Sequence, residues 1–150
     1  MEKKLEIGYY KYTIDQLPAD EKLLVIEAQA ALKKAYAKYS GFHVGAAVRL
    51  ASGKILHGAN SESEVFPSWL CAERVLLYNL QINHADDPIV AFAIASAPAE
   101  RECYPCGSCR QTLLDAQKRQ QSPIRIIMSS AESATVVDSA EELLPFSFKL

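Results

Sequence analysis

The feature that most restricts the fold of this chain is the pattern of apolar and amphipathic segments over residues 89–129. Residues 89–97 form an apolar segment that predicts a buried strand. The same reasoning predicts an amphipathic helix over residues 106–120 and a second buried strand over residues 123–129. Strand, helix and strand in this order form a βαβ unit, whose strands lie parallel and whose crossover is right-handed. We therefore predict an α/β fold with a partly parallel sheet and helices on both faces.

The remaining segments extend this fold to one domain of 150 residues. Pro18 and the acidic residues after it mark a helix start, and apolar residues recur at near-helical spacing from there to about Tyr39. Ser52-Gly53 is a turn signal between two strand-like stretches, which predicts a hairpin. The further predicted elements are a helix over 17–39, strands over 42–50 and 54–59, a loop over 60–68, a helix over 70–83, a strand over 135–138 and a short helix over 140–144.

Composition and charge exclude several functional classes. The chain has 16 Lys+Arg against 18 Asp+Glu, a net charge of −2, so it is not a generally cationic nucleic-acid binder. The longest apolar run, residues 89–95, is about a third of a membrane span, and the N-terminal residues lack the apolar segment of a signal peptide. We therefore expect a cytoplasmic protein that binds neither nucleic acid nor membrane. Disulfides are rare in that compartment, so the four cysteines are candidates for a metal site or a catalytic role.

Three of the cysteines lie at predicted helix starts. Cys106 and Cys109 are separated by two residues, which lets both sulfurs face one point, as tetrahedral zinc requires. Cys71 opens the other helix and would supply a third ligand. Helix N-termini favour thiolates because free N–H groups and the helix dipole stabilise negative charge there. Three protein ligands leave a fourth position for water, which is the pattern of catalytic rather than structural zinc.

A carboxylate beside these cysteines completes a catalytic pattern. Glu73 follows Cys71 by two residues, close enough to reach a water on the metal without binding the metal itself. Zinc lowers the pKa of a water that it binds to about 7, and a neighbouring carboxylate can take that proton and hand it to a substrate. The sequence thus predicts one Zn²⁺ per chain, with Glu73 as the proton shuttle.

Two other interpretations of the cysteines remain open. A C-x-x-C pair by itself also occurs in redox sites and in structural zinc sites. Cys103 extends the pair to C-x-x-C-x-x-C, which together with Cys71 could hold an iron–sulfur cluster or a closed four-cysteine zinc site. Against this alternative, Pro105 is expected to keep Cys103 extended and outside the helix, and a cluster leaves Glu73 without a role. We expect Cys103 to be a free thiol.

Five motifs occur in an order that resembles the small homotetrameric cytidine deaminases over nearly the whole chain. Cys-Ala-Glu-Arg at 71–74 and Pro-Cys-Gly-Ser-Cys-Arg-Gln at 105–111 match the signature of zinc-dependent base deaminases. Residues 39–47 resemble the family's Y-S-x-F-x-V-G-A-A, residues 58–62 its G-x-N-x-E, and residues 143–148 its L-L-P-x-x-F. The resemblance implies a single-domain three-layer α-β-α sandwich around a mixed five-stranded sheet, and a homotetramer.

The resemblance also implies an activity and a role for each site residue. The activity is the zinc-dependent hydrolysis of cytidine or 2′-deoxycytidine to the uracil nucleoside and ammonia, as in pyrimidine salvage. The metal ligands would be Cys71, Cys106 and Cys109, and the proton shuttle Glu73. The substrate-binding residues would be Phe42 against the base, the Ala72 backbone N–H on the base carbonyl, and Asn60 and Glu62 on a ribose hydroxyl. The residues that reach the site of a neighbouring subunit would be Glu64, Phe66 and Phe148.

The charge of the predicted zinc site needs compensation. Three thiolates on Zn²⁺ leave a net charge of −1, which weakens the pull of the metal on a water molecule. Arg74 lies three residues after Cys71, on an adjoining helix face, and we infer that its guanidinium donates hydrogen bonds to thiolate sulfurs. The resemblance supports this role. Arg110, which directly follows Cys109, is a second and weaker candidate.

One segment departs from the family pattern and leaves the substrate open. Relatives read N-x-E-N-A-[AS]-Y, whereas residues 60–66 read Asn-Ser-Glu-Ser-Glu-Val-Phe. The alternatives to cytidine are a modified nucleoside of the blasticidin type and a free base. A zinc-binding interaction module without activity is an alternative from a different class, and the intact Glu73 speaks against it.

Overall fold

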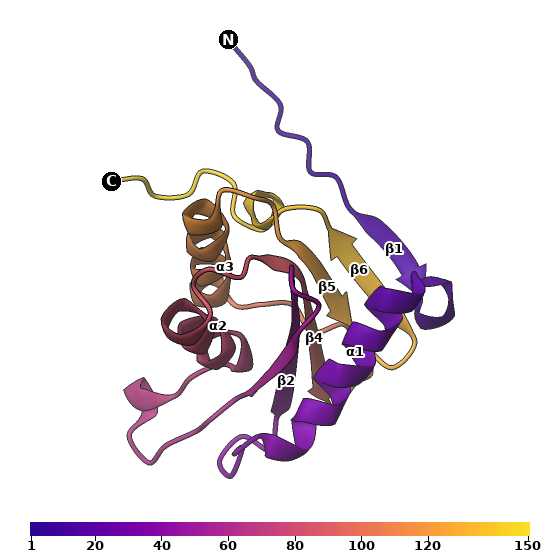
Figure 1. Ribbon diagram of the computed structural model, residues 1–150, viewed down its shortest axis with the longest axis vertical. Helices are drawn as coiled ribbons and strands as arrows, with labels where there is room; N and C mark the ends of the chain where they lie inside the picture. The colour runs from indigo at the N-terminus through magenta and orange to yellow at the C-terminus, as the bar shows by residue number, and fades with distance from the viewer.

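The computed structural model describes residues 1–150 and contains one six-stranded mixed sheet with helices on both faces (Figure 1). The strands are β1 (Tyr10–Thr13), β2 (His43–Leu50), β3 (Ile55–Ala59), β4 (Ile89–Ala97), β5 (Arg125–Ser129) and β6 (Ser133–Val137). The α-helices are α1 (Ala19–Ala31), α2 (Ala72–Asn83) and α3 (Gly107–Gln120). Short 3-10 helices are η1 (Ile14–Gln16), η2 (Leu32–Lys34), η3 (Phe66–Ser68) and η4 (Ala140–Leu143). The strand order is β1-β6-β5-β4-β2-β3.

The strand directions place two helix starts at one edge of the sheet. β4 and β5 are parallel, so the βαβ unit predicted from the sequence is confirmed. β2 is antiparallel to both β3 and β4, and β3 therefore runs in the same direction as β4. Because α2 connects β3 to β4 and α3 connects β4 to β5, both helices begin at the edge where these strands end.

The helices form two layers around the sheet, as predicted. α1 crosses one face, and α2 and α3 lie side by side on the other (Figure 1). The face under α2 and α3 carries a core of 20 buried residues, among them Phe92, Leu76 and Leu113. The face under α1 carries a smaller core of 11 buried residues, among them Leu24 and Ile127. The fold is thus the three-layer α/β sandwich that the resemblance implies.

Two glycines let helices lie directly on the sheet. A Cβ atom at Gly45 of β2 would lie 2.1 Å from the backbone oxygen of Ala28 in α1. At Gly58 of β3, a Cβ atom would lie 2.6 Å from the backbone oxygen of Ala72 and 2.7 Å from the Cβ of Leu76, both in α2. Contacts this short are not tolerated, so side chains are excluded at both positions. The glycine in β3 thereby sets how closely the start of α2 approaches the sheet.

The sheet has six strands rather than the expected five, because β1 was not predicted. Residues 10–13 are mostly exposed and carry no clear apolar face, so periodicity gives no signal there. Contacts with distant residues hold the strand in place. It pairs antiparallel with β6, and Lys11 Nζ donates to both oxygens of the buried Glu102 at 2.8 Å. Glu102 also accepts hydrogen bonds from Ser133 and Thr135 of β6, both at 2.6 Å.

The predicted end of the first helix is wrong, because hydrogen bonds to a distant segment replace helical ones there. The helix predicted over 17–39 ends at Ala31, because the Tyr36 backbone leaves the helical path to bond Asn60 and Glu62. The helix predicted to begin near Leu70 is confirmed and begins at Ala72, because the backbone of Leu70 pairs with that of Ser61. In both places, hydrogen bonds to a distant segment replace helical ones. The short helix predicted over 140–144 is the 3-10 helix η4.

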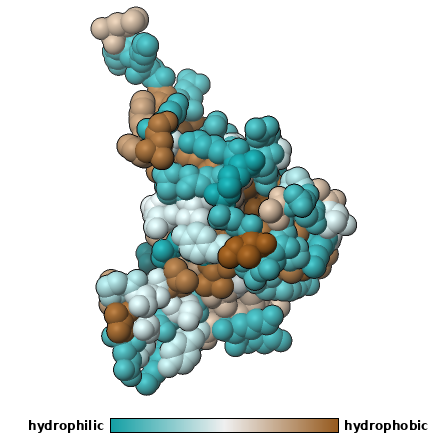
Figure 2. Space-filling model, turned by 60° about the vertical axis from the view of Figure 1, so that its left-hand side comes forward, coloured by the Kyte–Doolittle hydropathy of each residue, from teal (hydrophilic) through white to brown (hydrophobic).

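On the face shown in Figure 2, hydrophobic residues reach the surface in separate patches within a largely hydrophilic surface. The large apolar residues that are most exposed near the chain ends are Met1, Phe146, Phe148 and Leu150. No helix combines the length and the apolar character needed to span a bilayer.

The contact at Gly45 yields a first prediction. Gly45→Ala forces α1 away from the sheet, since the added Cβ meets a backbone oxygen rather than a mobile side chain. Overpacking of this kind costs about 1–3 kcal/mol, or a loss of roughly 3–10 °C in Tm. Thermal unfolding followed by circular dichroism measures this loss. Gly8→Ala is the matched control, because its Cβ would meet nothing closer than 3.8 Å and its Tm is expected to stay unchanged. A Gly45→Ala protein with unchanged Tm would contradict the packing described here.

Candidate metal centre and active site

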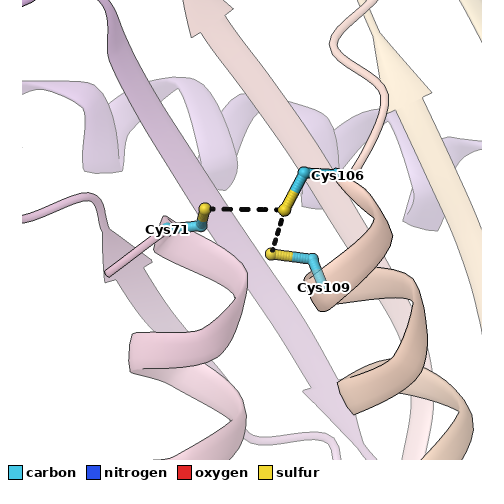
Figure 3. Close-up of side chains that lie close together, drawn as sticks. All are labelled: Cys71, Cys106 and Cys109. Carbon is cyan, nitrogen blue, oxygen red and sulfur yellow. Dashed lines mark hydrogen bonds between the residues drawn. The ribbon is translucent and has the colours of Figure 1, made fainter. Parts of the chain in front are cut away.

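Three cysteine sulfurs meet between the starts of α2 and α3 (Figure 3). Cys71 immediately precedes α2, and Cys106 immediately precedes α3. Cys109 lies in the first turn of α3 and is fully buried. The sulfur of Cys106 lies 3.8 Å from that of Cys71 and 3.6 Å from that of Cys109, and all three lie within 4.8 Å of one another. The structure thus brings together the three residues that the sequence singles out.

The spacing of these sulfurs fits zinc. Zn–S bonds of about 2.3 Å at tetrahedral angles place sulfur atoms about 3.8 Å apart. The two shortest separations, 3.8 and 3.6 Å, agree with that value. The donor set consists of three thiols and no carboxylate oxygen, which suits zinc rather than magnesium or calcium. Cys71, Cys106 and Cys109 are therefore able to hold a zinc ion with little rearrangement.

The surroundings of Cys71 stabilise negative charge on its sulfur. Hydrogen bonding with Cys109 and with Arg74 lowers the pKa of Cys71 to about 5, although burial acts in the opposite direction. Arg74 Nη2 donates to the sulfur of Cys71 at 3.8 Å, and this contact raises the pKa of the guanidinium. The Nε atom of Arg74 is buried and has no hydrogen-bond partner. The guanidinium of Arg74 therefore contacts the sulfur of Cys71, which is the contact that the sequence predicts for charge compensation.

Glu73 is a buried acid next to the cluster. Its side chain belongs to the first turn of α2 and is 3% exposed. Burial raises its pKa to about 7, and the charge on Cys71 contributes to the increase. A carboxyl group that titrates near neutral pH both accepts and donates protons readily. The position and the environment of Glu73 are those of a proton-transfer group.

The structure also answers two questions about neighbouring residues. Cys103 lies before α3, packs against the main core, and does not belong to the three-sulfur cluster. Burial raises the pKa of its thiol to about 11. Arg110, the weaker candidate for charge compensation, has no hydrogen bond to a cysteine sulfur. Its Nε donates to the Pro105 carbonyl at 2.9 Å and its Nη1 to the Leu143 carbonyl at 3.2 Å, so it ties the segment before α3 to η4.

Asn60 and Glu62, the predicted ribose ligands, are anchored to the segment before β2. Asn60 accepts a hydrogen bond from the Val44 N–H through Oδ1 and donates to the Phe42 carbonyl through Nδ2, each at 2.9 Å. Glu62 is buried and accepts from the Tyr39 N–H at 2.7 Å, and from the backbone and hydroxyl of the following serine. Burial alone would raise the pKa of Glu62, yet these hydrogen bonds hold it below its usual range. Both side chains therefore position residues 39–44, with hydrogen-bonding capacity left for a ligand.

The other predicted substrate contacts are distributed over several elements. Phe42 is 38% exposed and lies in the segment that Asn60 anchors. Ala72 is the first residue of α2, where backbone N–H groups have no acceptor within the helix. Glu64, Phe66 and Phe148 are exposed, and Phe148 belongs to a C-terminal segment far from the sulfur cluster in the chain.

Sequence reasoning missed two residues of this region, Ser40 and Trp69. The Ser40 hydroxyl donates to Glu62 and accepts from the Phe42 N–H at 3.0 Å. Trp69 Nε1 donates to the Ser63 carbonyl at 2.6 Å. The only signal for Trp69 was its uniqueness, since the chain has one tryptophan.

Three clustered cysteine sulfurs and an adjacent buried acid at the edge of an α/β sheet are the arrangement of a hydrolytic zinc enzyme. Residues 18–122 match the family described as the cytidine and deoxycytidylate deaminase zinc-binding region. The chain belongs to this family of deaminases, and zinc is its cofactor.

Individual relatives agree with this assignment. A cytidine deaminase of Halalkalibacterium halodurans is 32% identical over 129 residues, which are 86% of this chain and 94% of that protein. The crystal structure of a cytidine deaminase from Burkholderia pseudomallei is similar with a TM-score of 0.73 at 32% identity, over 84% of this chain and 97% of that one. The cytidine deaminase of Mycobacterium tuberculosis is similar with a TM-score of 0.69 at 27% identity, over 89% of this chain and 100% of that one.

The three-sulfur cluster yields a second prediction, on metal content. Cys103→Ser is expected to retain one zinc per chain, because its thiol lies outside the cluster, and Cys109→Ser is expected to lose most of it. Metal analysis by mass spectrometry after gel filtration measures both. Zinc lost together with Cys103, or the brown absorbance of an iron–sulfur cluster in the unaltered protein, would reject the three-thiolate site.

Proposed function

We propose that this protein deaminates cytidine or 2′-deoxycytidine by hydrolysis, releasing ammonia and the corresponding uracil nucleoside, in pyrimidine salvage. The observation that carries this proposal is the buried carboxylate of Glu73 beside three sulfurs at the converging starts of α2 and α3. A structural zinc site has no use for a buried acid at that place. The family to which the chain belongs, and the cytidine deaminases similar to it, support cytosine as the base.

Glu73 would carry the protons of the reaction. Zinc held by Cys71, Cys106 and Cys109 would supply a Lewis acid that makes a water molecule easier to deprotonate. As the oxygen of the attacking water bonds to C4 of the base, Glu73 would take one proton from that water and place it on N3. It would then transfer the second proton of this oxygen to the amino group. The C4–N bond breaks, ammonia leaves, and the carbonyl group of uracil remains.

The residues around the cluster would hold the nucleoside and balance the charge. Phe42 would stack on the base, and the free N–H of Ala72 at the start of α2 would donate to the base carbonyl. Asn60 and Glu62 would use their remaining hydrogen-bonding capacity on a ribose hydroxyl. Arg74 would offset the negative charge of the three thiolates through its contact with Cys71.

We further propose that the active form is a homotetramer. Phe66 is 71% exposed and Phe148 is 75% exposed, although large aromatic side chains are usually buried. Burial of these rings and of Glu64 at the site of a neighbouring subunit would account for their exposure in the single chain.

The third prediction tests the activity. Glu73→Gln is expected to keep its zinc and to lose about 10²–10⁴-fold in kcat, because only proton transfer is removed. Ammonia release and metal content, measured on the same samples with cytidine, 2′-deoxycytidine, cytosine and blasticidin, separate the alternatives. A wild-type protein that holds zinc and releases no ammonia would instead be an interaction module. Near-normal turnover in the variant would remove Glu73 from the mechanism.

A modified nucleoside is the second candidate substrate, and residues 63–66 favour it. Glu64 would place a negative charge near the 5′ end of the sugar, and Phe66 lacks the hydroxyl of the tyrosine that relatives carry. A negative charge there disfavours phosphorylated substrates and favours a nucleoside with a cationic group.

The fourth prediction separates these two substrates. If a modified nucleoside is the substrate, Glu64→Ala combined with Phe66→Tyr is expected to raise kcat/KM for cytidine by about tenfold, the equivalent of one recovered hydrogen bond of about 1.4 kcal/mol. Glu132→Ala, a change of another exposed glutamate in the turn between β5 and β6, is the control and is expected to have no effect. If the wild-type protein already processes cytidine at ~10⁵ M⁻¹s⁻¹ and the double variant gains nothing, plain cytidine is the substrate.

A further inference from the structure

Trp69 joins three segments of the chain beside the start of α2. Its indole Nε1–H donates a 2.6 Å hydrogen bond to the backbone carbonyl of Ser63. Its ring packs against that of Phe66, with centroids 4.8 Å apart, and against that of Tyr39, with centroids 5.9 Å apart and an interplanar angle of 27°. Trp69 itself lies two residues before the metal ligand Cys71. One side chain therefore contacts both segments that surround the proposed sugar-binding residues.

The segment that Trp69 stabilises is a loop closed at its base. The Ser61 N–H donates to the Leu70 carbonyl at 2.9 Å, and the Leu70 N–H donates to the Ser61 carbonyl at 3.0 Å. Within this closed loop, the indole links the carbonyl of Ser63, near its beginning, to the residue before its end. The loop is thus closed at its base by backbone hydrogen bonds between Ser61 and Leu70, and a second time by the side-chain hydrogen bond from Trp69 to Ser63.

These two sets of hydrogen bonds border a cleft that is lined by one of the metal ligands, Cys71. The cleft measures about 350 Å³, and its walls include Asn60, Glu62, Phe66, Trp69, Cys71 and Arg74. The proposed sugar ligands and the metal ligand Cys71 thus share one cleft with the indole. Tyr39, which stacks on Trp69, also donates its backbone N–H to Glu62 at 2.7 Å. Tyr39 therefore links the indole of Trp69 to the carboxylate of Glu62.

We propose that Trp69 is a positioning residue that sets the affinity of this site for the sugar hydroxyls of its substrate. The inference rests on the proposed nucleoside deaminase function and assigns a residue to its sugar specificity. Trp69 acts through Tyr39 and the Ser63–Phe66 segment, which hold Glu62 and one wall of the cleft in place. Side chains held in advance bind a ligand at lower entropic cost than side chains that must be ordered on binding. The chemical step depends on Glu73, which Trp69 does not contact, so the effect falls on binding.

The test compares two ligands that differ only in their sugar hydroxyls. The kcat and KM for cytidine, and the competitive inhibition constant of 2′,3′-dideoxycytidine, are measured for wild type, Trp69→Phe and Trp69→Ala. Trp69→Phe keeps a stacking ring and loses the N–H, and is expected to raise KM for cytidine about threefold. Trp69→Ala loses both and is expected to raise KM about 10–30-fold. In both variants kcat stays within about threefold. The inhibition constant of the dideoxynucleoside, which lacks the 2′ and 3′ hydroxyls that Glu62 would bind, stays within about twofold.

The control is Tyr78→Ala, which removes a partly exposed ring from α2 outside the cleft and is expected to change neither constant. Zinc content and Tm are measured on every variant. The inference is overturned if KM for cytidine and the inhibition constant of the dideoxynucleoside rise equally. It is also overturned if kcat falls in proportion to zinc content, or if KM is unchanged in Trp69→Phe. Should Trp69→Ala fail to fold, the Trp69→Phe comparison decides alone. Absence of wild-type turnover on cytidine refutes the proposed function and the inference with it, whereas normal wild-type turnover with unaffected variants refutes only the inference.

Discussion

The structure depends on the meeting of two helix starts at one edge of the sheet. β3, β4 and β5 run in the same direction, so the connections that leave β3 and β4 enter α2 and α3 at the same edge. Free backbone N–H groups and the positive ends of both helix dipoles then face one point. Three sulfurs gather at this point, and the environment favours negative charge on that of Cys71. If β3 or β4 ran in the opposite direction, Cys71 and Cys106 would be separated by about the length of a helix.

The same point is chemically demanding, because negative groups are crowded within it. Cys71 and Cys109 adjoin the buried Glu73, whose ionised form is disfavoured by burial and by the neighbouring sulfur. Arg74 supplies a positive charge from the next position of the same helix turn. Two acidic groups, Cys71 and Glu73, thus lie next to the positive charge of Arg74 within one turn of α2. Gly58 sets how closely that turn approaches the sheet.

The segments that would bind the sugar are built differently from the metal centre. They are loops, and they are attached to the framework by side chains rather than by the sheet. Asn60 and Glu62 bond the backbone of residues 39–44, and Trp69 stacks between the two loops. A metal centre on rigid helix starts beside a binding wall made of loops is the usual division between chemistry and specificity. Changes such as those at residues 63–66 are therefore able to alter the substrate without disturbing the metal ligands.

The sequence by itself determined the α/β class, the βαβ unit, the three-cysteine cluster and the adjacent acid. These features depend on local periodicity and on short spacings, such as Cys106 to Cys109, that a helix converts directly into proximity. Only the tertiary structure decided the strand β1, the end of α1 at Ala31, and the contacts of Arg110 and Trp69. The strand, the end of α1 and the contact of Arg110 with Leu143 depend on hydrogen bonds between residues far apart in the chain, such as Lys11 with Glu102. Trp69 stacks on Tyr39, which lies 30 residues earlier. Such pairings have no period and no motif, because their energy comes from partners that only the folded chain brings together.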